Sequence, residues 1–159
     1  MVKKICYNNF GKRSIRGKVF LGEYLHSLDG KNRLRLPPKL KKDFVSSMVL
    51  TCGADGCIYV LPKEKFDSLF SSSLSAPIFN SKTQHPLRLL FSKAEEVQED
   101  SQGRFLLPQS LKEHACIQKE VYFIGAGNRV EIWSKDRWEG YSKNLTFDKL
   151  SKELEKYGF

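Results

Sequence analysis

The same pattern of apolar and polar positions occurs twice in this chain, 71 residues apart. In each copy an aspartate is followed by three turn-type residues, an arginine, two apolar residues separated by one position, and a proline. The copies span residues 28–37 and 99–108. Apolar residues at alternate positions predict a half-buried strand, and the proline suits the first turn of a helix. Each copy is therefore predicted to form a strand, a polar loop, a second strand and a short helix.

The similarity between the two halves continues beyond these loops. Leu40 corresponds to Leu111 and, after a slip of one residue, Gly53 corresponds to Gly125. Residues 58–63 and 65–66 then match residues 130–135 and 137–138. Roughly 45 residues of each half align in this way, which indicates a tandem repeat.

Hydrophobic periodicity predicts the remaining elements. We expect hairpins over 23–36 and 94–107, each with its polar loop at the tip, and strands over 48–51, 57–61, 121–124 and 129–133. Helices are predicted to begin near residues 37, 62, 86 and 108, and Ser134 and Thr146 are candidate N-caps for two more.

The two polar loops have residues suited to a tight, braced turn. Asp29 and Asp100 can accept hydrogen bonds from amides further along the turn. Asn32 and Gly103 occupy the same position, and both residue types tolerate a left-handed backbone. We expect Asp29, Asp100, Gly103 and Arg104 to form a loop-bracing motif, with Arg104 pairing with its own aspartate.

The chain resembles the MraZ family of bacterial transcription regulators. The residues that carry the resemblance are Phe20-x-Gly22, Leu28-Asp29-x-Lys31-x-Arg33-Leu34, Asp100-x-x-Gly103-Arg104, Ile124-Gly125-x-Gly127-x-Arg129-x-Glu131-Ile132-Trp133 and Trp138. This resemblance implies an α+β fold in which two SpoVT-AbrB-like, swapped-hairpin repeats form one pseudo-two-fold β-barrel with peripheral helices. It also implies ring-like homo-oligomers and DNA binding through the arginine of the first loop.

We expect five segments along the chain. They are a basic, flexible extension (1–18), a first repeat (23–69), a connecting segment with a helix (70–93), a second repeat (94–138) and a C-terminal helical tail (139–159). Two interpretations of residues 1–18 stay open. The segment is either an arm that contacts phosphates or the product of a mis-assigned start, since family members usually begin with Met-Phe-x-Gly and residues 19–22 are Val-Phe-Leu-Gly.

The positive charge lies mainly in the N-terminal third of the chain. The formal net charge is +9, and residues 1–18 contribute six basic side chains and no acidic ones. Residues 22–45 have six basic and three acidic side chains, whereas residues 92–115 have three basic and five acidic. A bound polyanion is therefore expected at the first repeat.

The first loop supplies the candidate DNA-binding residues, which are Lys31, Asn32, Arg33 and Arg35. Lys31, Arg33 and Arg35 are at alternate positions, so on a strand their side chains would share one face. Such a face could cross a phosphate backbone, and an arginine can also contact a guanine edge through two hydrogen bonds.

Other chemistry has little support in the sequence. Cys52 and Cys57 are spaced like half a metal site, but no second pair of ligands is nearby, so buried structural thiols are the favoured interpretation. No catalytic constellation, Gly-rich phosphate loop or apolar run of membrane-spanning length is present in the sequence. We therefore expect a non-enzyme without cofactor, metal, membrane or small-molecule substrate.

The predicted function is sequence-specific binding of double-stranded DNA, at short direct repeats in a promoter. The resemblance implies regulation of the division and cell-wall gene cluster, including the gene of this protein. We expect a cytoplasmic protein associated with the nucleoid. The alternative is an antitoxin-like or protein-interaction module of the same fold.

Overall fold

The structure is a computed structural model that describes residues 19–42, 44, 47–73 and 80–158. The prediction for the extension (1–18) lies outside the described residues. The described part is a mixed α+β fold, as predicted. Its elements, in chain order, are β1 (Phe20–Ser27), β2 (Arg33–Arg35), α1 (Pro38–Lys41), β3 (Met48–Cys52), the 3-10 turn η1 (Ala54–Gly56), β4 (Ile58–Pro62), α2 (Lys63–Ser73), α3 (Ser81–Ser92), β5 (Glu95–Val97), β6 (Arg104–Leu106), α4 (Gln109–His114), β7 (Glu120–Gly127), β8 (Val130–Ser134), α5 (Lys135–Lys143) and α6 (Phe147–Glu155).

Strands of one repeat pair with strands of the other throughout the fold. A six-stranded antiparallel sheet has the order β1-β7-β8-β4-β3-β5, and β2 and β6 form a separate two-stranded sheet. Only the β3–β4 and β7–β8 pairs lie within a repeat. The β1–β7, β3–β5, β4–β8 and β2–β6 pairs all join the repeats. The two repeats are thus interlocked and cannot be separated without breaking both sheets.

The predicted hairpins over 23–36 and 94–107 are wrong in their pairing. The strands are present on either side of each loop, but β1 pairs with β7 and β2 pairs with β6. In the second repeat, β5 pairs with β3 and β6 returns to β2. Each loop therefore connects the six-stranded sheet to the two-stranded sheet. This pairing places Leu34 opposite Phe105, and both side chains are buried in the core.

The strand ladders also correct the predicted correspondence of Gly53 and Gly125. Val60 and Ile132 are equivalent, and they pair with Leu50 and Phe123 respectively. Counting along the strands from these pairs places Cys52, not Gly53, at the position of Gly125. The turn between β3 and β4 is one residue longer than the turn between β7 and β8. A sequence alignment that matches the two glycines therefore shifts β3 by one residue relative to β7.

Most helices begin close to the predicted residues. Ser134 and Thr146 are the N-cap residues of α5 and α6, although neither side chain makes a capping hydrogen bond. The helix predicted from residue 86 begins earlier, at Ser81, because Asn80 caps it by accepting a hydrogen bond from the backbone N–H of Lys82 at 3.1 Å. Pro86 lies inside that helix.

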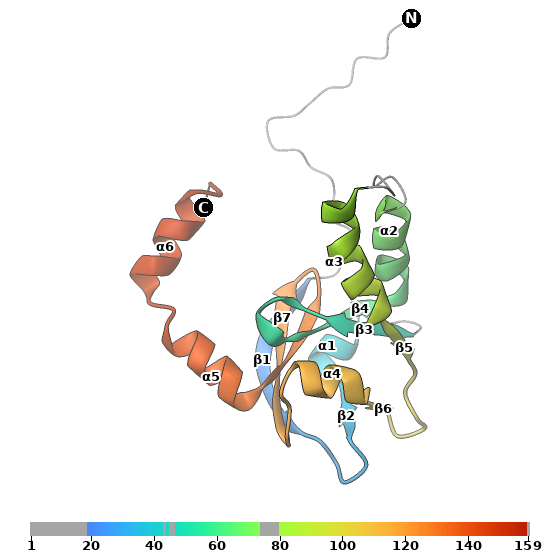
Figure 1. The fold of residues 1–159 in the computed structure, drawn as a ribbon. Helices are drawn as coiled ribbons and strands as arrows, with labels where there is room; N and C mark the ends of the chain where they lie inside the picture. Colours follow the sequence, from blue (N-terminus) through green and yellow to red (C-terminus); the bar gives the residue numbers. More distant parts are fainter. Residues whose placement is uncertain (1–18, 43, 45–46, 74–79, 159) are drawn as a thin grey trace, which may run out of the picture.

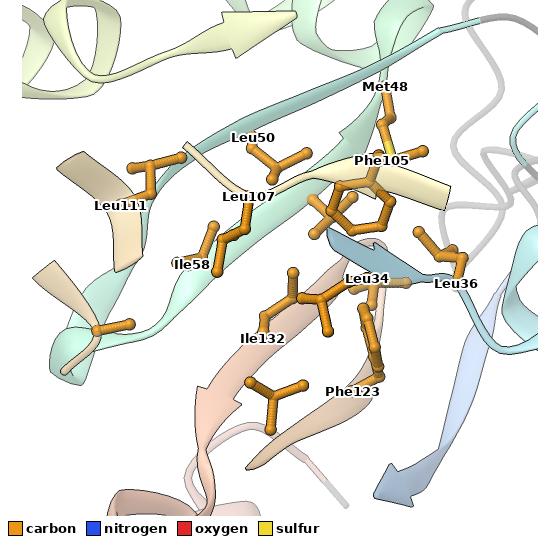
Figure 2. Close-up of a cluster of buried hydrophobic side chains, with 14 of the residues drawn as sticks. Leu34, Leu36, Met48, Leu50, Ile58, Phe105, Leu107, Leu111, Phe123 and Ile132 are labelled. Atoms are coloured by element: carbon orange, nitrogen blue, oxygen red, sulfur yellow. The ribbon is translucent and has the colours of Figure 1, made fainter. Parts of the chain in front are cut away.

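One hydrophobic core is shared by the two repeats. Equivalent residues of the two halves are buried in it: Leu34 and Phe105, which also pair across the β2–β6 sheet, Leu36 and Leu107, Leu40 and Leu111, and Leu50 and Phe123. Figure 2 shows several of these side chains converging from both sheets and from α4. Because this cluster contains residues of both repeats, each repeat buries apolar side chains against the other.

Candidate nucleic-acid interface

The two polar loops have the same network of hydrogen bonds. In the first loop Asp29 Oδ1 accepts the backbone N–H groups of Lys31 and Arg33, each at 2.9 Å. Its Oδ2 accepts the Nε–H of Arg33 at 2.8 Å and lies 2.7 Å from Arg33 Nη2. Local chemistry explains this arrangement, because an aspartate side chain has the length needed to reach amides two to four residues ahead.

The second loop has the same contacts between its aspartate and its arginine. Asp100 Oδ1 accepts the backbone N–H groups of Gln102 and Arg104 at 2.9 Å. Asp100 Oδ2 accepts Arg104 Nε–H at 2.9 Å and lies 2.8 Å from Nη2. Gly103, with φ of 71°, takes the left-handed position that Asn32 takes in the first loop with φ of 56°. The predicted equivalence of Asn32 and Gly103 is confirmed.

Both aspartates are held as carboxylates. The hydrogen bonds from the Arg33 side chain and backbone lower the pKa of Asp29 from 3.8 to about 2. At Asp100 the backbone N–H of Arg104, followed by its side chain, lowers the pKa by the same amount, to about 2. The loop geometry and the charge of each aspartate therefore stabilise one another.

The two loops lie side by side at one end of the molecule (Figure 1). Arg33 Nη1 is 3.5 Å from Asp100 Oδ2, so this arginine contacts the carboxylates of both loops. Among the described residues no matching contact joins Arg104 to Asp29. The backbone N–H of Leu107 donates to the carbonyl of Asn32 at 3.0 Å, which extends the β2–β6 pairing towards the first loop.

The small β2–β6 sheet has one apolar face and one cationic face. Leu34 pairs with Phe105, and both side chains are buried in the shared core. Arg33 pairs with Leu106 and Arg35 pairs with Arg104, and these side chains point away from the core. The result is a two-stranded ribbon whose outward face presents three arginines and an exposed leucine.

The four candidate DNA-binding residues are brought together, but not as one strand face. Lys31 lies in the turn before β2, and the left-handed Asn32 separates it from Arg33 and Arg35. The predicted alternation of three cations along a strand is therefore wrong for Lys31. Arg33 is already paired with two aspartates, whereas the described contacts include no ion pair for Lys31 or Arg35, whose side chains are exposed.

Two lysines that sequence reasoning missed reach across to the loops. Lys112 Nζ, on α4, donates to Asn32 Oδ1 at 2.6 Å. Its counterpart Lys41, on α1, pairs with Glu99 Oε2 at 2.5 Å, close to Gly103. Each loop is thus supported by the helix of the other repeat. The signal available in the sequence was the lysine that follows each member of the Leu40/Leu111 pair.

The remaining candidate groups of the sequence are the cysteines of the first repeat. Cys52 and Cys57 are buried free thiols, and burial raises the pKa of Cys57 to about 12. No group of three metal-binding side chains occurs among the described residues. No helix in this part of the chain combines the length and apolar character needed to cross a membrane.

Comparison with known proteins places both loops in matched segments. A family model described as "MraZ protein, putative antitoxin-like" matches residues 19–89 and again residues 90–156. The protein named transcriptional regulator MraZ from Clostridium beijerinckii is 41% identical over 141 residues, covering 88% of this chain and 99% of that protein.

Two further relatives with the same name show similar coverage. The protein from Clostridium acetobutylicum is 42% identical over 126 residues, 79% of this chain and 89% of its own length. That from Heliobacterium modesticaldum is 39% identical over 138 residues, 86% and 96% of the two chains. With its two interlocked repeats and paired aspartate–arginine loops, this chain belongs to the MraZ family.

Proposed function

We propose that this protein regulates transcription by binding double-stranded DNA through the first loop and the outward face of the β2–β6 ribbon. The observation that carries the proposal is the exposed position of Arg35 on the face of the ribbon opposite the buried Leu34 and Phe105. The names of the relatives support the regulatory role.

The shape of this surface suits a DNA groove. The major groove of B-DNA admits a two-stranded β-ribbon, and arginine and lysine side chains on its outer face can reach phosphates or base edges. In this ribbon Lys31 and Arg35 are the residues whose charge is not offset by a described ion pair. We assign them the direct contacts with DNA, while Asn32 and Arg33 fix the loop beside them and add further hydrogen-bond donors.

The binding surface of a single chain is small, so we propose that the protein acts as a ring-like homo-oligomer. Within each chain, the two repeats are proposed to form one pseudo-two-fold barrel. Pairing between strands of opposite repeats supports such a closed, swapped arrangement. Several loops on one duplex raise affinity through effective concentration. Regularly spaced direct repeats in a promoter are the DNA that a ring of identical loops fits.

The test compares Arg35→Ala with Arg33→Ala in DNA binding and thermal unfolding. Loss of a base or phosphate contact by Arg35→Ala is expected to cost about 1–3 kcal/mol per site, with an unchanged melting temperature. Arg33→Ala is expected to weaken binding and also lower the melting temperature, because Arg33 braces both loops.

Arg88→Ala, at an exposed position of α3 at the opposite end of the molecule from the loops (Figure 1), is the matched control for loss of one positive charge outside this surface. It is expected to reduce affinity only slightly and equally for specific and non-specific DNA. If Arg35→Ala bound its promoter DNA as tightly as the unchanged protein, the ribbon would not be the DNA-binding surface.

Footprinting upstream of the gene for this protein tests the proposed target, the division and cell-wall gene cluster. Protected short direct repeats are expected. An unprotected promoter together with a co-purifying protein would instead support the antitoxin-like or interaction module, for which the exposed acidic residues of β5 offer a surface.

A further inference from the structure

The symmetry between the repeats is broken at the last helix of each repeat. In the first repeat α3 packs back on α2: the ring of Phe91 makes edge contacts with Phe66 and Phe70, with centroid distances of 5.8 and 5.6 Å. Thr51 Oγ1 on β3 donates to the carbonyl of Leu90 at 2.6 Å. Helix α3 thereby covers the face of β3 that points away from the shared core.

The corresponding helix of the second repeat, α6, has no such packing among the described residues. It stands away from both sheets in Figure 1, and its apolar side chains are exposed, with Phe147 81% accessible and Leu150 and Leu154 on the same side. An isolated helix of nine residues is marginal in water, and most helices depend on burial of an apolar face. Helix α6 therefore lacks the contact that would stabilise it.

The surface equivalent to the one beneath α3 is open. Val49 and Thr51 are buried, but their counterparts in the ladder of the second repeat, Tyr122 and Ile124, are only half-buried. Next to them on the edge strand β1, Leu21 and Leu25 are 67% and 47% exposed. We call this surface the open β1–β7 face.

A hollow deepens this face beside α5. It has a volume of about 330 Å³, and Ile124, Trp138 and Tyr141 are among its lining residues. Trp138 is the counterpart of Phe66, against which α3 packs in the first repeat. The second repeat thus retains an aromatic surface equivalent to the one that receives α3, bordered by the Arg129–Glu131 ion pair.

The connection to α6 favours docking on another copy rather than on the same chain. The link between α2 and α3 spans residues 74–80, whereas the link between α5 and α6 spans only 144–146. The short link begins with backbone hydrogen bonds that close α5, from Asn144 to Tyr141 and from Leu145 to Ser142. Helix α6 stands away from its own sheet in Figure 1, and exchange of an element between identical chains is a low-cost route to a dimer.

We propose that α6 of one copy packs on the open β1–β7 face of a second copy, in the place that α3 takes on β3 and α2. Phe147, Leu150 and Leu154 provide the apolar side of α6, and Leu25 and Tyr141 lie on the receiving surface. This contact involves neither the loops nor the β2–β6 ribbon, so it does not depend on DNA binding.

The experiment measures the mass of the full-length chain without DNA, by native mass spectrometry and by light scattering. The donor variant is Leu150→Asp with Leu154→Asp, and the receiver variant is Leu21→Asp with Leu25→Asp. Both are expected to reduce the oligomer to single chains while retaining cooperative thermal unfolding. Leu89→Asp, on an exposed position of α3, is the matched control and is expected to leave the oligomer unchanged.

Mixing the two variants distinguishes exchange between copies from packing within one chain. The donor variant keeps an intact receiving face and the receiver variant keeps an intact α6, so an equimolar mixture is expected to form a dimer with one chain of each kind. A monomeric unchanged protein, variants that assemble normally, or a mixture that stays monomeric would each overturn the proposal. If the strand substitutions prevent folding, Tyr141→Asp on α5 disrupts the same face without altering a strand.

Discussion

A single carboxylate organises each loop of this protein. Asp29 accepts two backbone N–H groups and an arginine side chain, and Asp100 does the same 71 residues later. Glutamate has one more methylene and would move the carboxylate out of reach of the nearby amides. The geometry therefore requires aspartate, and it requires that aspartate to be ionised.

The ionisation of these aspartates predicts acid sensitivity of the loops. Their pKa falls from 3.8 to about 2 on folding, so their contribution to stability is complete above pH 4 and is lost as the pH falls through about 2. Carboxyl titration followed by NMR is expected to show both groups still ionised at pH 3. An apparent pKa near 4 for either group would mean that its hydrogen bonds are absent in solution.

Gly125 is needed because β1 crosses it closely. A Cβ atom at this position would lie 2.4 Å from Leu21 N and 2.6 Å from Leu21 Cα. We predict that Gly125→Ala destabilises the protein by about 1–3 kcal/mol in urea unfolding, because the strand backbone must shift. Gly140→Ala is the control: a Cβ atom added there would have no neighbouring atom within 4 Å, and a helix interior favours alanine.

At the residue scale, the sequence predicts correctly those features that depend only on residues a few positions apart. Residues close in the sequence determine the left-handed backbone of Asn32 and Gly103 and the turns around the two aspartates. The sequence pattern therefore predicts both features correctly. The contact of Lys112 with Asn32 crosses 80 positions and depends on how the repeats interlock. No local pattern encodes that contact.

At the scale of elements, strands were predictable and their partners were not. Alternation marked β2 and β6 correctly, since Leu34 and Phe105 are buried between more accessible neighbours. A short connection usually joins strands that pair, which is why hairpins were expected. The partners of β1 and β2 lie in the opposite repeat, and the local pattern of apolar residues does not encode a pairing between distant segments.

The two loop arginines are predicted to differ in function despite their similar contacts. Arg104 is paired through Nε and Nη2 with Asp100, in a segment where acidic residues outnumber basic ones. Arg104→Ala is expected to lower the melting temperature and leave DNA affinity nearly normal. The same gel-shift and melting assays used for Arg33→Ala test this. Lost binding with an unchanged melting temperature would mean that both repeats contact the duplex.

At the scale of the whole molecule, the shared core makes unfolding cooperative across both repeats. Leu34 belongs to the first repeat, whereas Trp133 and Trp138, the two tryptophans of the chain, belong to the second. We predict that Leu34→Ala lowers the free energy of unfolding by about 2–5 kcal/mol when tryptophan fluorescence is the probe. The exposed Leu106→Ala is the control and is expected to change it by less than about 0.5 kcal/mol.

A fluorescence transition that did not move in Leu34→Ala would indicate that the second repeat unfolds independently. In that case the equivalent apolar pairs of Figure 2 would not form a single cooperative core.

The pairing of β1 with β7 also has a consequence for protein synthesis. Strand β1 begins at Phe20 and its partner β7 begins at Glu120, so the first strand of the sheet leaves the ribosome 100 residues before its partner. At about 5–20 residues per second this interval lasts roughly 5–20 s. During that time Leu21 and Leu25 lie in an unpaired strand, which is a site for aggregation or chaperone binding. The nascent chain can complete its sheet only after β7 has emerged.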